Sequence, residues 1–367
     1  MRFPEFSGEW KKVRLGEECN MLCGYAFNGE DIVEQGSYLL MRGINITEGS
    51  IRHSPELDRY YSGSIEKLDK YKLAVGDLVI GMDGSKVGRN SAIVSSYEDG
   101  SYLVQRVCRI KSSIGNNYIL QLINNTKFHQ YVDTVKTSSA IPHISLGDIQ
   151  NFRISIPPTQ DETDKIAKLF LLLDERIATQ NKIIERYESL IRGIAQKITR
   201  NNKPNVLLAE CLKCSSSTLQ ESDVCENGTY PVYGANGIVG YLDGYSTEDE
   251  AVHIIKDGSG VGAVSYVTGK CSATGTLNTL QAKDGYLLQY LYYMLKVFNF
   301  EPYKTGMAIP HIYFKDYGKA KIFCPSYTEQ LKYVGILSAI DNKLSAEQSI
   351  LTNLSLQKQY LLRQMFI

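Results

Sequence analysis

The most restrictive feature of this sequence is that one long pattern occurs twice. The four residues Ile-Pro-His-Ile stand at 141–144 and again at 309–312, which places His143 and His311 168 residues apart. In both places a proline-containing segment follows, and after it a long stretch of helical periodicity. Because the same pattern favours the same local structure wherever it occurs, we expect two related halves.

The helical stretches carry apolar residues at alternating steps of four and three, which is the heptad spacing of a coiled coil. The first seam consists of Ile166, Phe170, Leu173, Ile177, Gln180, Ile184, Tyr187, Ile191, Ile194 and Ile198. The second seam, shifted by 167 residues, consists of Tyr333, Leu337, Ile340, Leu344, Glu347, Leu351, Leu354, Lys358, Leu361 and Met365. Its polar residue Glu347 aligns with the polar interruption Gln180 of the first.

A helix over 161–198 would be roughly 57 Å long at about 1.5 Å per residue. Helices of this length rarely survive alone in water, so the seam needs a partner. We therefore predict that the two helices pack side by side, antiparallel, as a coiled coil. The alternative is that they are ordinary core helices of a bundle.

The ends of both helices carry matching signals. Thr159 or Thr328 can cap the first turn, in which Glu162 and Glu329 place an acid, and Asn-Asn-Lys-Pro at 201–204 ends the first helix. Further apolar residues lie off the first seam, and a two-stranded coil would leave some of them exposed to water. We expect another protein to cover that face, which includes Leu169, Leu171, Leu172, Ile183 and Leu190.

The remainder of each half repeats in outline. An apolar strand, a Gly-rich turn and a return strand occur at 79–94 and at 254–267, and a short helix is expected to open at Tyr118 and at Tyr286. This indicates an α+β fold with two pseudo-repeated globular domains joined by the two helices. The expected segments are 1–155, 156–200, 201–325 and 326–367.

The two halves differ most in residues 42–75 and 215–250, which do not align. Two equal scaffolds with unlike loops suggest one task that is performed on two different targets.

Charge and hydropathy exclude little. Forty basic and forty acidic residues give a formal net charge of zero, which counts mildly against a DNA-binding domain, although a one-sided distribution or a basic partner can compensate. No signal peptide is visible, and no apolar run approaches the ~18 residues of a spanning helix. We expect a cytoplasmic chain without a membrane partner.

The eight cysteines would then be reduced thiols. Cys211 and Cys214 have the spacing of a zinc half-site, with Cys225 and Cys271 as conceivable further ligands. However, the position that aligns with Cys214 in the first half is Leu22. A metal site is not expected to lose a ligand at an equivalent position, so we predict no metal here.

Other motifs that invite a catalytic interpretation are better explained by structure. The run Asp-Gly-Ser-Gly-Val-Gly at 257–262 lacks the lysine and the following helix of a phosphate loop, so a hairpin turn is favoured and a hydrolase built on it is not. His143 and His311 follow proline before an apolar strand, and we interpret them as residues that dock each globular part onto its helix. No constellation of catalytic side chains is recognisable, and we predict no catalytic residue.

Polar and basic residues in the Gly-rich turns, in the divergent loops and just before each Ile-Pro-His-Ile motif are candidates for contacts with nucleic acid. Arginine reads guanine and asparagine reads adenine well, whereas lysine and threonine suit phosphates. Any one of them could instead be an ordinary solvated side chain. The candidates are Arg42, Arg52, Arg59, Lys86, Arg89, Asn90, Lys136, Thr137, Ser138, Ser139, Tyr233, Asn236, Tyr245, Lys256, Lys304 and Thr305.

Taken together, the duplicated Thr-x-x-Ala-Ile-Pro-His-Ile box (137–144 and 305–312), the proline after it, the acid that opens each helix and the heptad seams resemble the specificity subunit of type I restriction-modification enzymes. The resemblance implies two target-recognition domains, each reading one half of a split DNA sequence. It implies that the helices set the spacing between the half-sites and dock two methyltransferase (modification) subunits.

The same resemblance implies where the chemistry resides. The modification subunits would bind S-adenosylmethionine, and restriction subunits would join for ATP- and Mg-dependent translocation and cleavage. This chain would hold no cofactor of its own. The alternative from another class is a coiled-coil adaptor that binds two protein ligands and no nucleic acid, and co-purification with an adenine methyltransferase would discriminate between the two.

Overall fold

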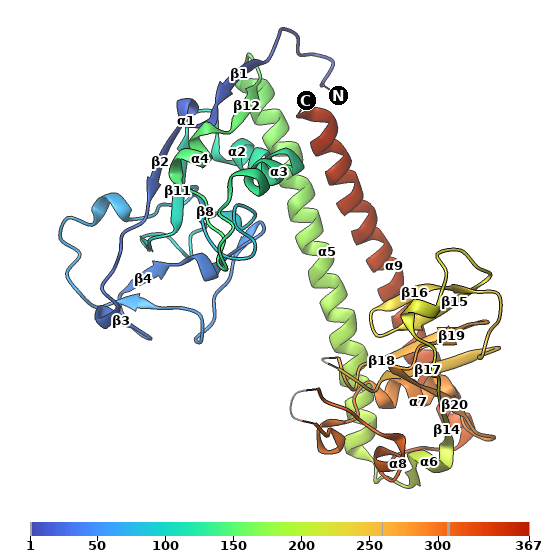
Figure 1. Ribbon diagram of the computed structural model, residues 1–367. Coiled ribbons are helices and arrows are strands. Elements are labelled where there is room, and N and C mark those ends of the chain that lie inside the picture. The colour runs from blue at the N-terminus through green and yellow to red at the C-terminus, as the bar shows by residue number, and fades with distance from the viewer. Residues whose placement is uncertain (1, 259, 307–308, 367) are drawn as a thin grey trace. The chain divides into compact units, whose positions relative to one another are not determined.

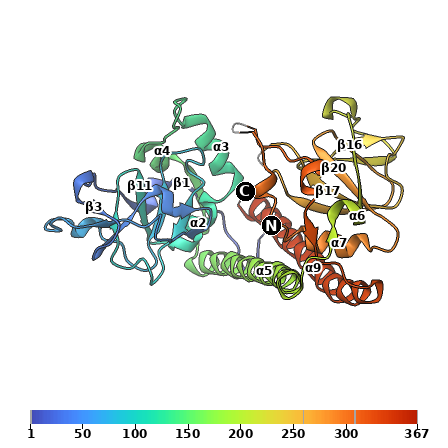
Figure 2. The same ribbon diagram turned by 90° about the horizontal axis from the view of Figure 1, so that it is seen from below.

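The computed structural model of the protein describes residues 2–258, 260–306 and 309–366 (Figure 1). By its contacts the chain divides into two compact units. Unit 1 comprises Met1–Thr179 with Leu351–Ile367, and unit 2 comprises Gln180–Ile350. Each unit therefore holds one globular part and a stretch of both long helices. Figure 2 gives a second view of the same elements.

The globular part of unit 1 contains a strand pair, a four-stranded main sheet and four short helices, which we together call the frame. An antiparallel pair joins β1 (Lys11–Arg14) to β12 (Arg153–Ile156). The main sheet has the order β2-β11-β8-β9, and its strands are β2 (Cys19–Cys23), β8 (Leu78–Gly81), β9 (Ser91–Ile93) and β11 (Val107–Ser112). The accompanying helices are α1 (Leu15–Glu18), α2 (Asn116–Ile123), α3 (Thr126–Val135) and α4 (Leu146–Asn151).

A second, smaller sheet lies beyond this frame, with the order β10-β4-β7-β3. Its strands are β3 (Ile32–Val33), β4 (Tyr38–Met41), β7 (Tyr60–Tyr61) and β10 (Tyr102–Leu103), and a hairpin of β5 (Ile46–Thr47) and β6 (Ser50–Ile51) stands beside it. Three 3-10 turns complete this unit, η1 (Gly29–Asp31), η2 (Gly43–Asn45) and η3 (Asp69–Tyr71).

Unit 2 repeats the frame with the same topology. The antiparallel pair is β13 (Val206–Leu207) with β21 (Lys321–Ile322). The main sheet has the order β14-β20-β17-β18, and its strands are β14 (Leu212–Ser216), β17 (Glu250–Ile255), β18 (Val264–Thr268) and β20 (Leu277–Ala282). Its helices are α6 (Leu208–Cys211), α7 (Leu288–Leu295) and α8 (Phe314–Tyr317). The predicted α+β duplication is thereby confirmed strand by strand.

The outer sheet of unit 2 differs from that of unit 1. It has three strands in the order β16-β15-β19, namely β15 (Tyr230–Gly234), β16 (Gly237–Leu242) and β19 (Ser272–Ala273). Two pairings are shared, because β15 pairs parallel with β19 as β4 does with β10, and antiparallel with β16 as β4 does with β7. Among the described residues, unit 2 has no counterpart of β3 in this sheet. Two 3-10 turns, η4 (Glu221–Asp223) and η5 (Glu301–Tyr303), belong to this unit.

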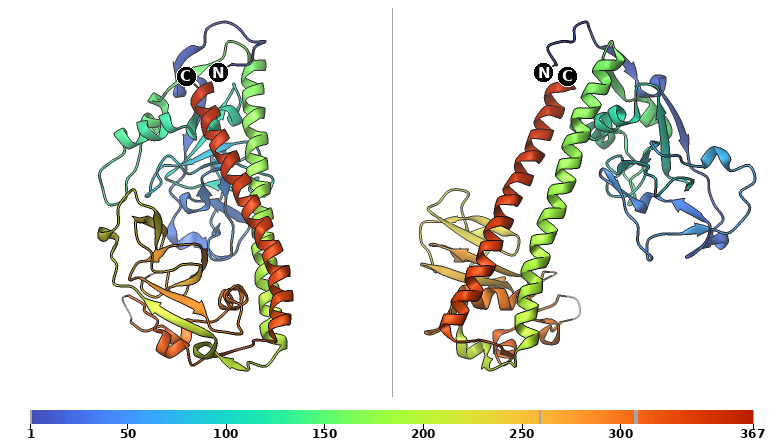
Figure 3. Two further views of the ribbon diagram at one scale, coloured as in Figure 1. Left: turned by 90° about the vertical axis from the view of Figure 1, so that its right-hand side faces the viewer. Right: turned by 180° about the vertical axis from the view of Figure 1, so that it is seen from behind.

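The two long helices are α5 (Gln160–Asn201) and α9 (Tyr327–Met365). Within unit 1 the ring of Phe170 stacks on that of Phe366 with centroids 5.7 Å apart, and Lys358 pairs with Asp174, so the two stretches run antiparallel. Every predicted seam position on both helices is buried or half-buried. Figure 3 shows these stretches next to each other, and the predicted antiparallel packing is confirmed in this unit.

Within unit 2 the polar interruptions of the two seams meet. The Gln180 side-chain amide donates to the main-chain oxygen of Glu347 at 3.0 Å and also bonds to the Glu347 carboxylate. The alignment of the two seams placed these residues at equivalent positions, and antiparallel packing brings them into contact. A buried amide that finds its partner in this way fixes the register of the two helices.

One local prediction needs correction. The expected cap Thr328 lies inside α9, because the helix begins at Tyr327 and Ser326 precedes its first turn, donating to Glu329 Oε2 at 2.9 Å. Thr159 does precede α5, and its hydroxyl accepts from the Glu162 N–H at 3.4 Å. None of the helices in the described ranges is long and apolar enough to cross a membrane.

Candidate functional site

The repeated box and the Gly-rich turn form one composite structure in each unit. In unit 1 the N–H of Gly84 donates to Pro142 O at 3.0 Å, and in unit 2 the N–H of Gly258 donates to Pro310 O at 3.1 Å. Both glycines have a positive φ, +92° and +96°, a conformation that other residues rarely adopt. The turn leads into a strand in each case, as the hairpin interpretation predicted.

The two histidines anchor this structure through different side-chain partners. Backbone bridges join Asp83 to His143 and Asp257 to His311. His143 Nδ1 lies 3.0 Å from Thr137 Oγ1, whereas His311 Nδ1 lies 2.6 Å from Asp257 Oδ1. The histidines are structural as expected, but the contacts that they make hold the box against the hairpin rather than against a long helix.

Three of the predicted cations of unit 1 gather beside the hairpin. Arg89 Nη2 lies 2.8 Å from Asp133 Oδ2, and Lys136 Nζ lies 2.6 Å from the other oxygen of the same carboxylate. Lys86 lies 3.2 Å from Glu48. The hydrogen bond from Lys136, together with the nearby positive charge of Arg89, holds the pKa of Asp133 below its ordinary value. The group is a surface cluster of cations, each of which already has an acidic neighbour.

The predicted arginines of the divergent loop in unit 1 hold that loop in shape. Arg42 Nη1 donates to Leu57 O at 3.4 Å, and Arg52 Nη2 donates to Ile44 O at 3.3 Å. Arg59 Nη1 donates to the main-chain oxygen of Asp58 at 2.7 Å. These bonds are compatible with contacts to a nucleic acid, because each guanidinium has further donors.

A histidine that the sequence did not single out lies at the centre of the same loop. His53 Nδ1 is 3.0 Å from Asp58 Oδ1, and His53 Nε2 is 2.9 Å from Glu98 Oε1. Burial alone would raise the pKa of Glu98, but hydrogen bonds from Ser95 and His53 outweigh it and lower that pKa. The ring of Tyr97, 64% exposed, lies 4.4 Å from the imidazole. The positions of His53, Asp58 and Glu98 in the sequence follow no regular spacing that would predict this cluster.

The candidates of unit 2 are more scattered. Asn236 is exposed between β15 and β16, while Tyr233 is half-buried with its ring 5.5 Å from that of His253. Tyr245 is exposed, and the ammonium of Lys270, which the sequence did not single out, lies 4.5 Å from its ring centroid.

The remaining candidates take part in the frame itself. The main-chain oxygen of Lys256 accepts from Ile312 N at 2.9 Å, and that of Asn90 accepts from Gly81 N at 2.9 Å. Lys304 lies 2.6 Å from Glu301. The hydroxyl groups bond locally, as with Thr305 to His311 O at 3.4 Å and Ser139 to Ile141 O at 2.7 Å, while Ser138 is exposed.

A buried histidine stands out in unit 2. His253 in β17 is 1% exposed, and neither ring nitrogen has a hydrogen-bond partner among the described residues. Burial lowers its pKa from 6.5 to about 4. The imidazole is therefore held neutral in the main sheet, where a charged ring would be costly.

The cysteines do not assemble a metal site in the described ranges, where no group of three or more His, Cys, Asp and Glu side chains could hold an ion. Cys211 is buried and Cys225 is exposed. Burial raises the pKa of the Cys211 thiol to about 12, which disfavours the thiolate that binds metals.

The long helices also leave apolar side chains exposed to solvent. Of the predicted off-seam residues, Leu169 and Ile183 are half-buried, whereas Leu172 is 54% exposed. Exposed large apolar or aromatic residues on the two helices are Leu171, Leu172, Leu190, Tyr327, Leu331, Ile336, Ile350, Leu356 and Tyr360.

Comparison with known proteins gives a family for this arrangement. The family described as type I restriction modification DNA specificity domain matches residues 7–189 and 208–355. The specificity subunit of the type I restriction enzyme EcoAI from Escherichia coli is 28% identical over 179 residues, which are 47% of this chain and 29% of that protein. A putative type I restriction enzyme specificity subunit from Haemophilus influenzae is 30% identical over 123 residues, covering 33% of this chain and 32% of its own. The chain thus spans about a third of the length of these relatives.

Solved structures show the same fold. The S subunit of a type I restriction-modification system from M. genitalium superposes with a TM-score of 0.66 at 17% identity, covering 100% of this chain and 97% of its own. A chain from a structure on complex assembly and conformational transition of the type I restriction-modification system superposes with a TM-score of 0.51 at 16% identity, covering 98% of both chains.

Proposed function

This chain belongs to the family of type I restriction-modification DNA specificity domains, and from that premise we propose that it reads a two-part DNA sequence, one globular part on each half-site. Specificity subunits recognise DNA and leave catalysis to other subunits. An adaptor without nucleic acid, the alternative from the sequence, has no support from the family.

The observation that carries the proposal is the contrast between the frame and the outer sheet of each unit. The frames share strand order and the hydrogen bonds between box and hairpin, whereas the outer sheets have four strands in unit 1 and three in unit 2. A constant support with a variable outer region suits two readers that recognise different bases.

The predicted contact residues remain candidates under this proposal. Lys86, Arg89 and Lys136 would approach phosphates, exchanging their acidic neighbours for the DNA backbone. The polar side chains of the outer sheets, such as Asn236 and Tyr233, would approach base edges. Because the net charge is zero, we expect the chain to bind DNA tightly only with its partner subunits.

The helices would serve the partners. An α5 of 42 residues rises about 63 Å if it is straight, which is long enough to separate two readers by one turn of DNA or more. The exposed leucines and isoleucines of α5 and α9 would be covered by two methyltransferase (modification) subunits. S-adenosylmethionine would bind to those subunits, and ATP and Mg would act with the restriction subunits.

A domain exchange tests the division of labour. Replacing residues 205–308 by the corresponding segment of a family member with another specificity should change only one half of the methylated sequence in the host. The matched control replaces residues 12–140, which should change only the other half. Methylome sequencing reads both outcomes, and a change in both halves or in neither contradicts the proposal.

A further inference from the structure

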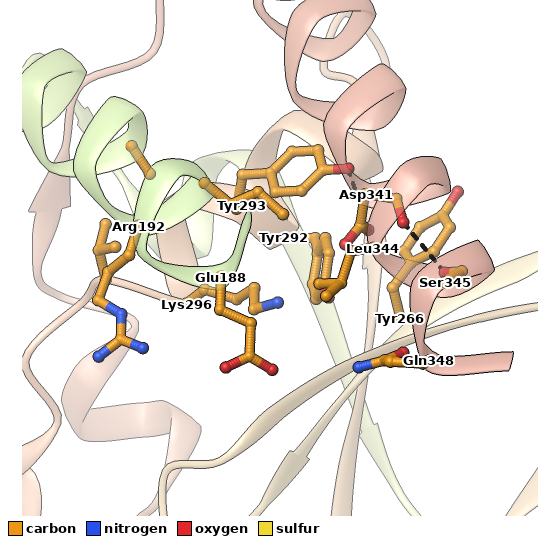
Figure 4. Close-up of a pocket in the computed structure, with 13 residues that line it drawn as sticks. Glu188, Arg192, Tyr266, Tyr292, Tyr293, Lys296, Asp341, Leu344, Ser345 and Gln348 are labelled. Atoms are coloured by element: carbon orange, nitrogen blue, oxygen red, sulfur yellow. Dashed lines mark hydrogen bonds between the residues drawn. The ribbon is translucent and has the colours of Figure 1, made fainter. Parts of the chain in front are cut away.

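A pocket of about 530 Å³ opens in unit 2 where α5, α9 and α7 meet. Figure 4 shows Tyr293 of α7 reaching Asp341 of α9, with Tyr292 of α7 and Tyr266 of β18 close to them. From α5, Ile191 and Ala195 complete the apolar part of the wall. The pocket thus combines aromatic faces and short aliphatic side chains with two acidic residues, Glu188 and Asp341, and two basic ones, Arg192 and Lys296.

The repeat shows what fills the same place in unit 1. A shift of 167 residues relates the helices, so Asp174 corresponds to Asp341, Lys358 to Ile191 and Leu362 to Ala195. In unit 1 the ammonium of Lys358 pairs with one oxygen of Asp174, and Gln121 Nε2 donates to the other at 3.1 Å. Leu362 is buried in the core beside them.

Unit 2 has kept the carboxylate and lost its cation. With Ile191 in place of a lysine and Ala195 in place of a leucine, both the positive charge and the bulk are missing. Asp341 accepts from the hydroxyl of Tyr293 at 3.2 Å, and no cation of the described residues pairs with it. Two cations line the pocket, Arg192 of α5 and Lys296, and the ammonium of Lys296 lies 5.1 Å from the ring centroid of Tyr292.

We propose that this pocket receives a lysine or arginine side chain of the methyltransferase subunit that docks on the stretches of α5 and α9 within unit 2, an inference that rests on the proposed function. The aliphatic stem would lie along Ile191 and Ala195. The cationic head would reach Asp341 and the faces of the tyrosine rings, which attract positive charge.

The two docking places are therefore unequal. A second, identical methyltransferase subunit would present the same cation to unit 1, where Lys358 already occupies Asp174. The subunit at unit 2 gains a charge-assisted contact that the other cannot make. Binding of the two copies should proceed in a tighter and a weaker step.

Titration of the full-length chain with its methyltransferase subunit, followed by calorimetry and native mass spectrometry, tests this. The wild type should show two steps, and Asp341→Asn should weaken the tighter one by roughly tenfold or more and leave the weaker one unchanged. Asparagine still accepts from Tyr293, so the fold is retained. Ile191→Lys, which restores the internal cation of unit 1, should have the same effect, and the exposed control Glu185→Gln should have none.

The outcomes separate the two proposals. If both copies bind but neither Asp341→Asn nor Ile191→Lys alters the tighter step, the pocket proposal is overturned and the proposed function stands. If Lys296→Gln weakens binding while Asp341→Asn does not, the pocket takes an acidic group and the proposal is equally overturned. A wild-type chain that binds no methyltransferase subunit overturns both.

Discussion

The two globular parts are alike near the long helices and unlike away from them. Strand order, the positive-φ glycine of the hairpin and the bonds between box and hairpin recur in both units. The outer sheets share one parallel and one antiparallel pairing, but they differ in the number of strands, four in unit 1 and three in unit 2. The repeated sequence pattern therefore encodes the frame next to the long helices. The outer sheet can differ between the two units as long as its ends lead back into that frame.

The two units also carry different residues at some equivalent positions of the frame and of the helix starts. By the register of the bridges at the two histidines, Val79 of β8 corresponds to His253 of β17, and both are buried. At the helix starts Glu162 is fully buried and Glu329 is exposed. Such pairs allow each effect to be measured in one unit with the other as its control.

The largest effect is expected at His253. Its folded pKa of about 4 lies below the ordinary 6.5, so between these values the unfolded chain binds a proton that the folded chain does not, and stability falls as the pH falls. The full loss approaches about 3 kcal/mol by pH 4. His253→Val, which installs the residue of unit 1, should remove this dependence in denaturant titrations at pH 7.5 and 5.

The converse variant sharpens the comparison. Val79→His should introduce a pH dependence of the same sign into unit 1, because it buries an imidazole at the equivalent place. Equal slopes for wild type and His253→Val between pH 7.5 and 5 would show that the ring of His253 is not the source.

A smaller effect on thermal stability is expected when the acidic residue in the first turn of each long helix is neutralised. Glu162 receives two bonds from the Arg2 guanidinium, at 2.7 and 2.6 Å, and one from Trp10 Nε1 at 3.3 Å, whereas Glu329 bonds to Ser326 at the surface. Glu162→Gln should therefore lower Tm by several degrees, since it removes the charge that this buried site is built to hold. Glu329→Gln should leave Tm nearly unchanged. Equal shifts in differential scanning calorimetry would contradict the assigned difference.

The smallest effect concerns the two histidines of the frame. Asp257→Ala removes the side-chain partner of His311 and should cost about 1 kcal/mol, a value kept low because both side chains are about a third exposed. Asp83→Ala should cost less, because His143 bonds to Thr137 instead. Denaturant midpoints of the two variants, measured at pH 7, would refute this ranking if they moved equally.

Much of the fold could be predicted from the sequence because the repeat supplies its own alignment. The seams of α5 and α9 are recognisable as heptads, and the sequence predicts that Gln180 and Glu347 occupy equivalent positions. Their contact additionally depends on the register of the antiparallel pair. Boundaries were less secure. The start of α9 at Tyr327 moved the cap from Thr328 to Ser326, since several hydroxyl residues compete there.

The outer sheets and their loops could not be predicted, for a physical reason. His53 and Glu98 are 45 residues apart, and nothing periodic connects them. The pairing of Arg89 with Asp133 likewise depends on how α3 packs against the hairpin. Such contacts are set by tertiary packing rather than by local spacing, so the candidate contact residues could be named but not grouped.

The bonds that seat each box against its hairpin run between main-chain atoms, as with Ile144 N to Met82 O at 3.0 Å and Ile312 N to Lys256 O at 2.9 Å. Main-chain bonds do not depend on which side chains surround them. Two genes of this kind that recombined within their box-encoding stretches would therefore yield a chimaera with intact joints. New combinations of half-sites would then arise by crossover, without any stepwise repair of the scaffold.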